Sequence, residues 1–199
     1  MSETEPEEDD DAAVIARSRQ DPEVFAEIFR RHAPDIKRFV VRRLGVDAAE
    51  DVVAETFLVA FRRRGRYDMA YSSARPWLYG IATKLIGRHV RTEVRHLRVW
   101  ERTGVDPVTE PFTDRSDERV SAQAHGKALA GALASLPKGH RDALLLVVWG
   151  GLSYAEAAHA LGVRVGTVRS RINRARTRLR KQLGDVAPVP YLPEEPVYE

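Results

Sequence analysis

The fold is decided by residues 152–176, whose sequence is LSYAEAAHALGVRVGTVRSRINRAR. Ser153 and Glu156 have the S-x-x-E spacing of a capping box, which predicts that a helix begins just after Ser153. Gly162 predicts the end of that helix, because glycine readily adopts the left-handed backbone conformation that a sharp stop needs. A second helix follows the turn Gly162-Val163-Arg164. Two short helices joined at a glycine indicate a helix-turn-helix.

The second of these helices has two different faces. One face is apolar and predicted to be buried, because its members recur at helical spacing: Val168, Ile172, Ala175, Leu179 and Leu183. The rest of the helix surface carries side chains that can bind phosphates or base edges: Thr167, Arg169, Ser170, Arg171, Asn173, Arg174, Arg176, Thr177 and Arg178. Residues 164–181 contain basic residues and no acidic one, whereas a solvated helix normally mixes both signs. This face is therefore predicted to bind duplex DNA.

The charge of the whole chain hides a strongly basic body. The 199 residues carry a net charge of +3, but residues 2–11 hold seven acidic residues and residues 184–199 hold four, with no base in either segment. The segment between them contains all 32 Lys and Arg residues and 18 acidic ones, a net charge of +14. A body of this charge is predicted to bind a nucleic acid or another polyanion.

Several other classes of protein are disfavoured by composition. No apolar run approaches the roughly 20 residues that span a bilayer, and no signal peptide opens the chain, so a soluble cytoplasmic protein is expected. The chain has no cysteine, which excludes disulfides and thiolate zinc sites. Its six histidines are scattered without a metal-binding motif, and there is no glycine loop to cradle a phosphate. We therefore expect no metal, no cofactor and no catalysis by this chain.

Helical periodicity divides the chain into two domains. It fades between Val99 and Gln123, where prolines stand at positions 107 and 111, and no strand pattern of useful length occurs anywhere. The sequence predicts an all-α protein with these parts: an acidic disordered tail over 1–11, a first domain over 12–97, a flexible linker over 98–121, a second domain over 122–184 and a proline-rich acidic tail over 185–199.

The helices expected within the domains follow from caps and apolar faces. In the first domain they run from Pro22 to about Arg31 with Asp21 as N-cap, from about Pro34 to Leu44, from about Ala48 to Arg64 with Asp47 as N-cap, and from Ala74 to about Arg95. The third is expected to bury Val52, Val53, Phe57, Leu58 and Phe61. In the second domain, helices over 121–136 and 138–149 are expected to pack beneath the helix-turn-helix.

A second nucleic-acid site is predicted before and along the helix of residues 74–95. Tyr67 and Tyr71 stand in the preceding loop, next to a cluster of arginines at positions 62–64 and 66. Lys84, Arg88 and Arg91 follow on one stripe of the helix. Exposed aromatic rings interleaved with basic residues are suited to unpaired bases, which stack on the rings.

Four blocks of this sequence, in order, resemble the sigma-70 superfamily, and specifically the extracytoplasmic-function (group 4) sigma factors of bacterial RNA polymerase. The blocks are DAAEDVVAETF at 47–57, RPWLYGIA at 75–82, LP at 136–137 and GTVRSRINRAR at 166–176. The resemblance covers both predicted domains and leaves the linker and tails unmatched. It implies a protein that binds core RNA polymerase and directs promoter-specific initiation.

The resemblance also implies a role for each block. The helix of residues 48–64 would dock on the clamp helices of the β′ subunit, with contacts by Asp51, Ala54, Glu55 and Leu58. The segment 65–91 would capture the unpaired −10 strand with a base flipped out of the stack, which assigns this role to Tyr67, Tyr71, Lys84, Arg88 and Arg91. The helix-turn-helix would bind the −35 duplex, with Arg171 and Arg178 on phosphates. The β subunit and an anti-sigma factor are further expected partners.

Some positions depart from the family pattern. Lys84 and Arg88 stand where many members carry Asn and Asp, Ala54 stands where Gln is usual, and Asn173 replaces a bulky residue. Asn suits an adenine edge, so the base preferences of relatives do not transfer to this chain. The alternative to a sigma factor is a helix-turn-helix regulator that acts without polymerase; it would typically need a dimer interface or an effector pocket, and the sequence shows neither.

Overall fold

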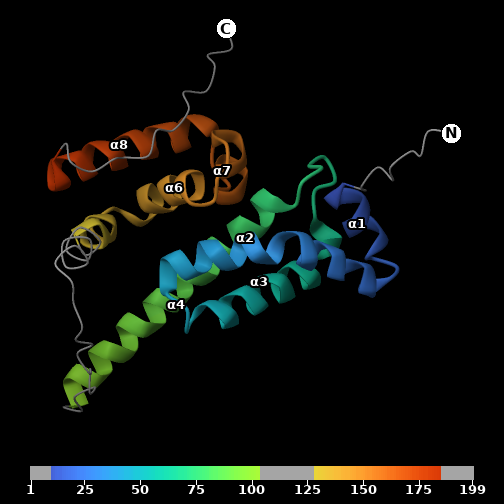
Figure 1. The fold of residues 1–199 in the computed structure, drawn as a ribbon, viewed down its shortest axis with the longest axis horizontal. Coiled ribbons are helices and arrows are strands. Elements are labelled where there is room, and N and C mark those ends of the chain that lie inside the picture. The colour runs from blue at the N-terminus through green and yellow to red at the C-terminus, as the bar shows by residue number, and fades with distance from the viewer. Residues whose placement is uncertain (1–9, 104–127, 185–199) are drawn as a thin grey trace, which may run out of the picture. The chain divides into compact units, whose positions relative to one another are not determined.

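The structure, a computed structural model, describes residues 10–103 and 128–184. These residues contain helices, turns and bends but no strand, and the chain divides into two compact units (Figure 1). The N-terminal unit holds the helices α1 (Asp11–Arg17), η1 (Pro22–Phe25), α2 (Ala26–Leu44), α3 (Ala49–Arg63), η2 (Arg64–Arg66) and, as far as Val90, α4 (Arg75–Thr103). The C-terminal unit holds a helical segment over 128–134, then α6 (Lys138–Val148), α7 (Tyr154–Leu161) and α8 (Val165–Leu183). The prediction of an all-α protein with two helical domains is confirmed.

The core of the N-terminal unit lies between α2, α3 and α4. Phe39 of α2 and Tyr79 of α4 pack edge to face, with ring centroids 5.0 Å apart, and both rings are buried. Val52, Val53 and Phe57 form the buried side of α3, as predicted. Figure 1 shows α2 and α3 side by side in this unit.

Helix α2 differs from the prediction of two helices broken at Pro34. Asp21 caps the short helix η1, its carboxylate accepting the Glu23 N–H over 3.2 Å, and α2 then continues through Pro34 to Leu44. Proline in a helix interior removes one hydrogen bond and crowds the preceding turn. Burial of the apolar face on both sides of it, from Ile28 to Phe39, outweighs that cost.

Helix α3 corrects three further expectations. Its N-cap is Ala48, with no side-chain hydrogen bond, so Asp47 is not the cap. Leu58 is not buried but 46% exposed, because it points away from the side that carries Val53 and Phe57. Phe61 is only partly buried; its ring packs on Phe25 and beneath the Arg64 guanidinium, whose Cζ lies 3.9 Å from the ring centroid.

The predicted tail and linker boundaries also shift where the structure describes them. Asp10 and Asp11, expected in the N-terminal tail, are the N-cap and first residue of α1. Helix α4 runs to Thr103, so residues 98–103 extend the helix rather than begin the linker. The other residues of the predicted tails and linker lie outside the described residues.

The helix-turn-helix forms through the local signals that predicted it. The Glu156 carboxylate accepts the Ser153 N–H over 2.7 Å, and the Ser153 hydroxyl accepts the Glu156 N–H over 3.2 Å, so both bonds of the capping box are made. Gly162 has φ +64°, and the Val163 N–H donates to the Ala158 carbonyl over 3.0 Å. The turn therefore fixes where α8 begins.

Helix α8 packs its predicted apolar face against the C-terminal core. Val168, Ile172, Ala175 and Leu179 are buried, whereas Leu183 near the helix end is half-buried. Helix α6 runs beside α8 (Figure 1).

Replacement of Ile172 by alanine is expected to destabilise this unit by about 2–5 kcal/mol, because its fully buried side chain would leave a cavity. Urea unfolding followed by circular dichroism measures the change. Arg180→Ala, at an exposed position of the same helix, is the matched control and should stay within about 0.5 kcal/mol of the unmodified protein. Equal losses in both variants would contradict the assignment of the buried face.

Candidate nucleic-acid interface

The first candidate interface is the exposed face of α8. Arg169, Ser170, Asn173, Arg174 and Arg178 are exposed, and Thr167, Arg171 and Arg176 are half-buried. The Ser170 hydroxyl donates to the Thr167 carbonyl over 3.1 Å, and that of Thr177 to the Asn173 carbonyl over 3.1 Å. The residues predicted to bind the −35 element therefore lie on one helix, and the opposite face of this helix packs against the core of the C-terminal unit. Among the described residues, the far part of this face lines an open groove: Asn173, Arg174, Thr177, Arg178, Lys181 and Gln182.

The start of α6 lies beside the arginines of this face. A Cβ on Gly139 would lie 3.2 Å from Cζ of Arg171, so the absence of a side chain there lets the guanidinium approach the helix. Burial, together with the charges of Arg174, Arg171 and Arg178, lowers the pKa of His140. Sequence reasoning missed His140, because its neighbours on α8 are more than 30 positions away along the chain. A cluster of like charges of this kind is stabilised by a bound polyanion.

The second candidate interface is the loop over residues 67–73, and here the structure corrects one expectation. Tyr67 is only 6% exposed, its ring packs against Trp77 with centroids 5.0 Å apart, and its hydroxyl donates to the Tyr71 carbonyl over 2.7 Å. The prediction that its ring is exposed for base stacking is wrong, because the ring belongs to the packing of the loop on α4. Burial, with the nearby carboxylates of Asp11, Asp10 and Asp68, raises the pKa of Tyr67.

The loop presents two other side chains instead. Tyr71 is 40% exposed, as predicted, and Met69 is 38% exposed. The loop turns at Asp68, whose carboxylate accepts the Ala70 N–H over 3.0 Å and whose carbonyl accepts the Tyr71 N–H over 3.2 Å. Sequence analysis missed Met69, since a single methionine in a loop carries no pattern.

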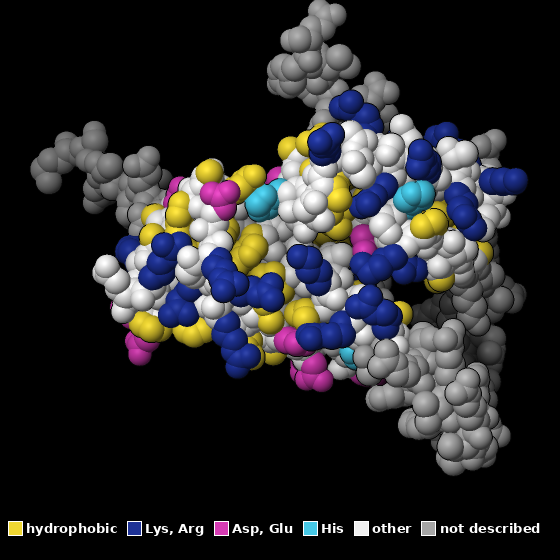
Figure 2. Space-filling view, turned by 180° about the vertical axis from the view of Figure 1, so that it is seen from behind, with side chains coloured by type: hydrophobic (Ala, Val, Ile, Leu, Met, Phe, Trp, Pro, Cys, Tyr) yellow, Lys and Arg dark blue, Asp and Glu magenta, His cyan; other side chains and the backbone are white. Residues whose placement is uncertain are grey.

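The cations predicted on α4 lie at its surface. Lys84, Arg88 and Arg91 are all exposed. Arg88 also forms an ion pair with Glu55 of α3, which ties a predicted −10 residue to a predicted polymerase contact. Figure 2 shows Lys and Arg as the commonest charged side chains on the visible face of the described residues.

The third candidate surface is the outer side of α3. Asp51, Ala54, Glu55 and Leu58 are all exposed and recur at spacings of three, one and three, so they share one helix face. Leu58 lies one turn after Glu55, and an exposed leucine beside a carboxylate is suited to a partner with an apolar pocket and a basic group near it.

The described residues show no group of three or more His, Cys, Asp or Glu side chains that could hold a metal ion. None of the helices in this part of the chain has the length and apolar character needed to cross a membrane.

Comparison with known families matches both units. Sigma-70 region 2 matches residues 28–96, and Sigma-70 region 4 matches residues 126–179. The chain belongs to the sigma-70 family, and within it to the extracytoplasmic-function (ECF) RNA polymerase sigma factors.

Individual relatives agree with this assignment. The probable RNA polymerase sigma-C factor of Mycobacterium bovis is 38% identical over 154 residues, which cover 77% of this chain and 78% of the relative. The RNA polymerase sigma factor CarQ of Myxococcus xanthus is 32% identical over 165 residues, covering 82% and 91% of the two chains.

Solved structures show the same fold. That of CnrH in complex with the cytosolic domain of CnrY has a TM-score of 0.60 at 24% identity and covers 89% of this chain and 99% of CnrH. That of RpoE in complex with the anti-sigma factor NepR from Bartonella quintana has a TM-score of 0.57 at 24% identity, covering 82% and 98%.

Proposed function

We propose that this chain binds bacterial core RNA polymerase and directs promoter-specific initiation by binding the −35 element as duplex and the −10 element as melted DNA. The observation that carries the proposal is the pairing of two basic surfaces on one chain: the exposed face of α8 in a fully capped helix-turn-helix, and the loop of residues 67–73 with α4. The names of the relatives support the same role. Each surface needs only moderate affinity, because binding of one raises the effective concentration of the other.

At the −35 element, α8 would lie in the major groove of the duplex. Asn173 and Arg174 can form bidentate hydrogen bonds with adenine and guanine edges respectively. Arg169, Ser170 and Arg176 would lie nearest the other bases, Thr167 would contact the adjoining DNA, and Arg171 and Arg178 would bind phosphates.

At the −10 element, Tyr71 would stack on an unpaired base while Lys84, Arg88 and Arg91 bind the backbone of the same strand. The buried Tyr67 would act through the conformation of the loop, and Met69 is an additional apolar contact candidate.

Tyr71→Ala is expected to weaken binding of the holoenzyme to a single-stranded −10 oligonucleotide by roughly 5- to 150-fold, the loss of one stacking interaction of about 1–3 kcal/mol. Fluorescence anisotropy with a labelled oligonucleotide measures the affinity. Tyr71→Phe keeps the ring and should bind like the unmodified protein. Equal loss in the phenylalanine variant would show that the ring is not what binds.

The α3 face would dock on the β′ clamp helices through Asp51, Ala54, Glu55 and Leu58, and the β subunit would be contacted as well. An anti-sigma factor is a further proposed partner. The domain that we propose for the polymerase and −10 functions begins with α1 and includes the whole of α4, to Thr103. Residues 122–184 would serve the −35 function. A protein with these partners works in the cytoplasm and performs no catalysis itself.

The alternative function, a helix-turn-helix regulator that needs no polymerase, predicts different DNA binding. A library of genomic duplex fragments is incubated with the chain alone, with core polymerase alone, and with both. The proposed function predicts selective enrichment of fragments only when both are present. Equal selectivity by the chain alone, with no complex formed with core polymerase, would favour the regulator.

A further inference from the structure

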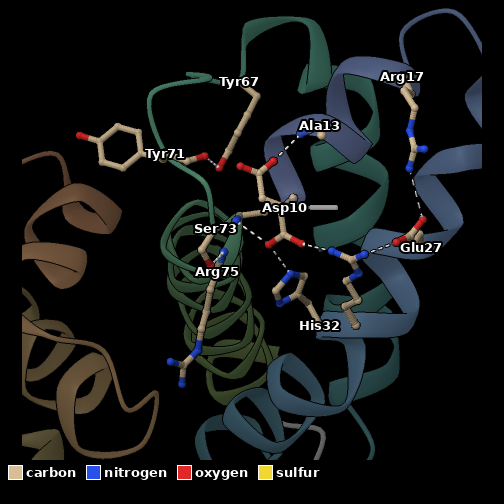
Figure 3. Close-up of polar contacts among 12 residues, drawn as sticks. Asp10, Ala13, Arg17, Glu27, His32, Tyr67, Tyr71, Ser73 and Arg75 are labelled. Atoms are coloured by element: carbon tan, nitrogen blue, oxygen red, sulfur yellow. Dashed lines mark hydrogen bonds and ion pairs between the residues drawn. The ribbon is translucent and has the colours of Figure 1, made fainter. Parts of the chain in front are cut away.

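Asp11, the first residue of α1, is a buried carboxylate with partners on three sides. It is only 6% exposed. One oxygen, Oδ2, accepts hydrogen bonds from Nε2 of His32 and from the backbone N–H of Ala74, both over 2.7 Å. The other, Oδ1, accepts Nη1 of Arg31 over 3.2 Å. Figure 3 shows these contacts at the start of α4, together with the labelled His32.

These bonds join three elements that are far apart in sequence. Arg31 and His32 belong to α2, and Ala74 directly precedes α4. Arg31 also pairs with Glu27, whose carboxylate is 3.8 Å from Nη2 of Arg17 on α1. Burial of a carboxylate costs desolvation free energy unless it is fully paired. Apolar side chains at this junction would not carry that cost.

The ionised form of Asp11 is the one that the junction stabilises. Burial raises the pKa of this carboxyl, but the hydrogen bonds from His32 and Ala74, the charge of His32 and the hydrogen bond from Arg31 outweigh it, so the pKa lies below its ordinary value. The stabilisation is therefore present at neutral pH and is lost as the pH falls through the lowered pKa.

The element that Asp11 holds is the loop of residues 67–73. The bond to the Ala74 N–H fixes the point where this loop enters α4, and the Tyr67 hydroxyl bond to the Tyr71 carbonyl closes the loop from within. Asp10 and Asp11 also lie close enough to Tyr67 to raise its pKa. Between these two fixed points stand the exposed side chains of Met69 and Tyr71.

We propose that Asp11 is a positioning residue, which holds the 67–73 loop in the conformation that takes up the unpaired −10 strand. This inference rests on the proposed function. Ordering a loop at the moment of binding costs free energy, so a loop that is fixed beforehand binds more tightly without any new contact. Helix α1 would thus contribute to −10 binding without touching DNA.

The test uses holoenzyme assembled from core polymerase and full-length variants. Asp11→Asn keeps the shape of the side chain but loses its charge, and with it the pairing to Arg31 and His32. Ala74→Pro keeps the Asp11 carboxylate with Arg31 and His32 and removes the backbone donor at the end of the loop. Glu27→Gln is the matched control, because it removes the other carboxylate partner of Arg31 without touching Ala74.

Three quantities are measured for each variant: affinity for core polymerase, affinity of the holoenzyme for a single-stranded −10 oligonucleotide, and affinity of the holoenzyme for a −35 duplex. We expect Asp11→Asn and Ala74→Pro to weaken binding to the single strand by about tenfold, the scale of one charge-assisted hydrogen bond. The other two affinities should change less than twofold, and Glu27→Gln should change none of the three.

The outcomes separate this inference from the proposed function. Single-strand affinity within twofold of the unmodified protein in both variants would overturn the role of Asp11. A parallel loss of core binding would also overturn it, since Asp11 would then merely stabilise the domain. If the unmodified holoenzyme does not distinguish the −10 strand from a scrambled one, the proposed function itself fails.

Discussion

Replacement of Leu58 by aspartate is expected to weaken the binding of this chain to core RNA polymerase by roughly 100-fold. Leu58 is 46% exposed and is the large apolar side chain of the proposed docking face of α3, one turn after Ala54 and Glu55. Burial of a leucine side chain contributes about 1.5–3 kcal/mol, and a buried aspartate without a partner adds a desolvation cost to that loss. Titration of fluorescently labelled protein with core polymerase measures the effect.

The fold should tolerate this change, because the side chain already contacts water. A change at such a position usually shifts the free energy of unfolding by less than about 0.5 kcal/mol. Val46→Asp is the matched control: Val46 is 67% exposed but precedes α3 and lies outside the proposed docking set. Equal loss of polymerase binding in both variants would show that the added negative charge weakens binding wherever it is placed. Retention of binding in Leu58→Asp would show that α3 is not part of the interface.

Asn173→Ala is expected to relax the preference of the holoenzyme at a single base pair of the −35 element. A bidentate contact between asparagine and adenine contributes about 1–3 kcal/mol of discrimination, so affinity for the preferred sequence should fall by roughly 5- to 150-fold while other sequences change little. Asn173 is exposed on α8, and stability should stay unchanged. Binding is measured with duplexes that carry each of the four base pairs at every −35 position.

Arg178→Ala provides the contrast, since Arg178 is proposed to bind a phosphate. It should weaken binding about equally for every duplex. It should also reduce the slope of log affinity against log salt concentration by about one. A uniform loss in Asn173→Ala, with no change in base preference, would assign Asn173 to the backbone as well and contradict the proposed mode of −35 recognition.

The parts of the fold that local sequence determines could be predicted. The capping bonds of Ser153 and Glu156 and the positive φ of Gly162 depend on residues within a few positions of each other, and all are found in the structure. The buried stripe of α8 could be predicted for the same reason, because helical periodicity alone assigns its face.

Features that depend on distant residues could not be predicted. Nothing near Tyr67 in sequence shows that its ring is covered by Trp77. The apolar pattern of α3 identifies its buried side but does not show that Leu58 lies outside it. Asp11 stands at the end of the acidic run of residues 2–11, so its burial could not be recognised from the sequence. Its hydrogen-bond partners are 20, 21 and 63 positions away. A proline that normally breaks a helix was accommodated at Pro34 because tertiary packing overrides local preference.

The most direct test of the central claim is run-off transcription by purified bacterial core RNA polymerase, with and without this protein, on a pool of promoter fragments from its host. We expect transcripts that appear only with the protein and that start downstream of shared −35 and −10 elements. Absence of such transcripts from active core, together with duplex binding by the protein alone, would contradict it.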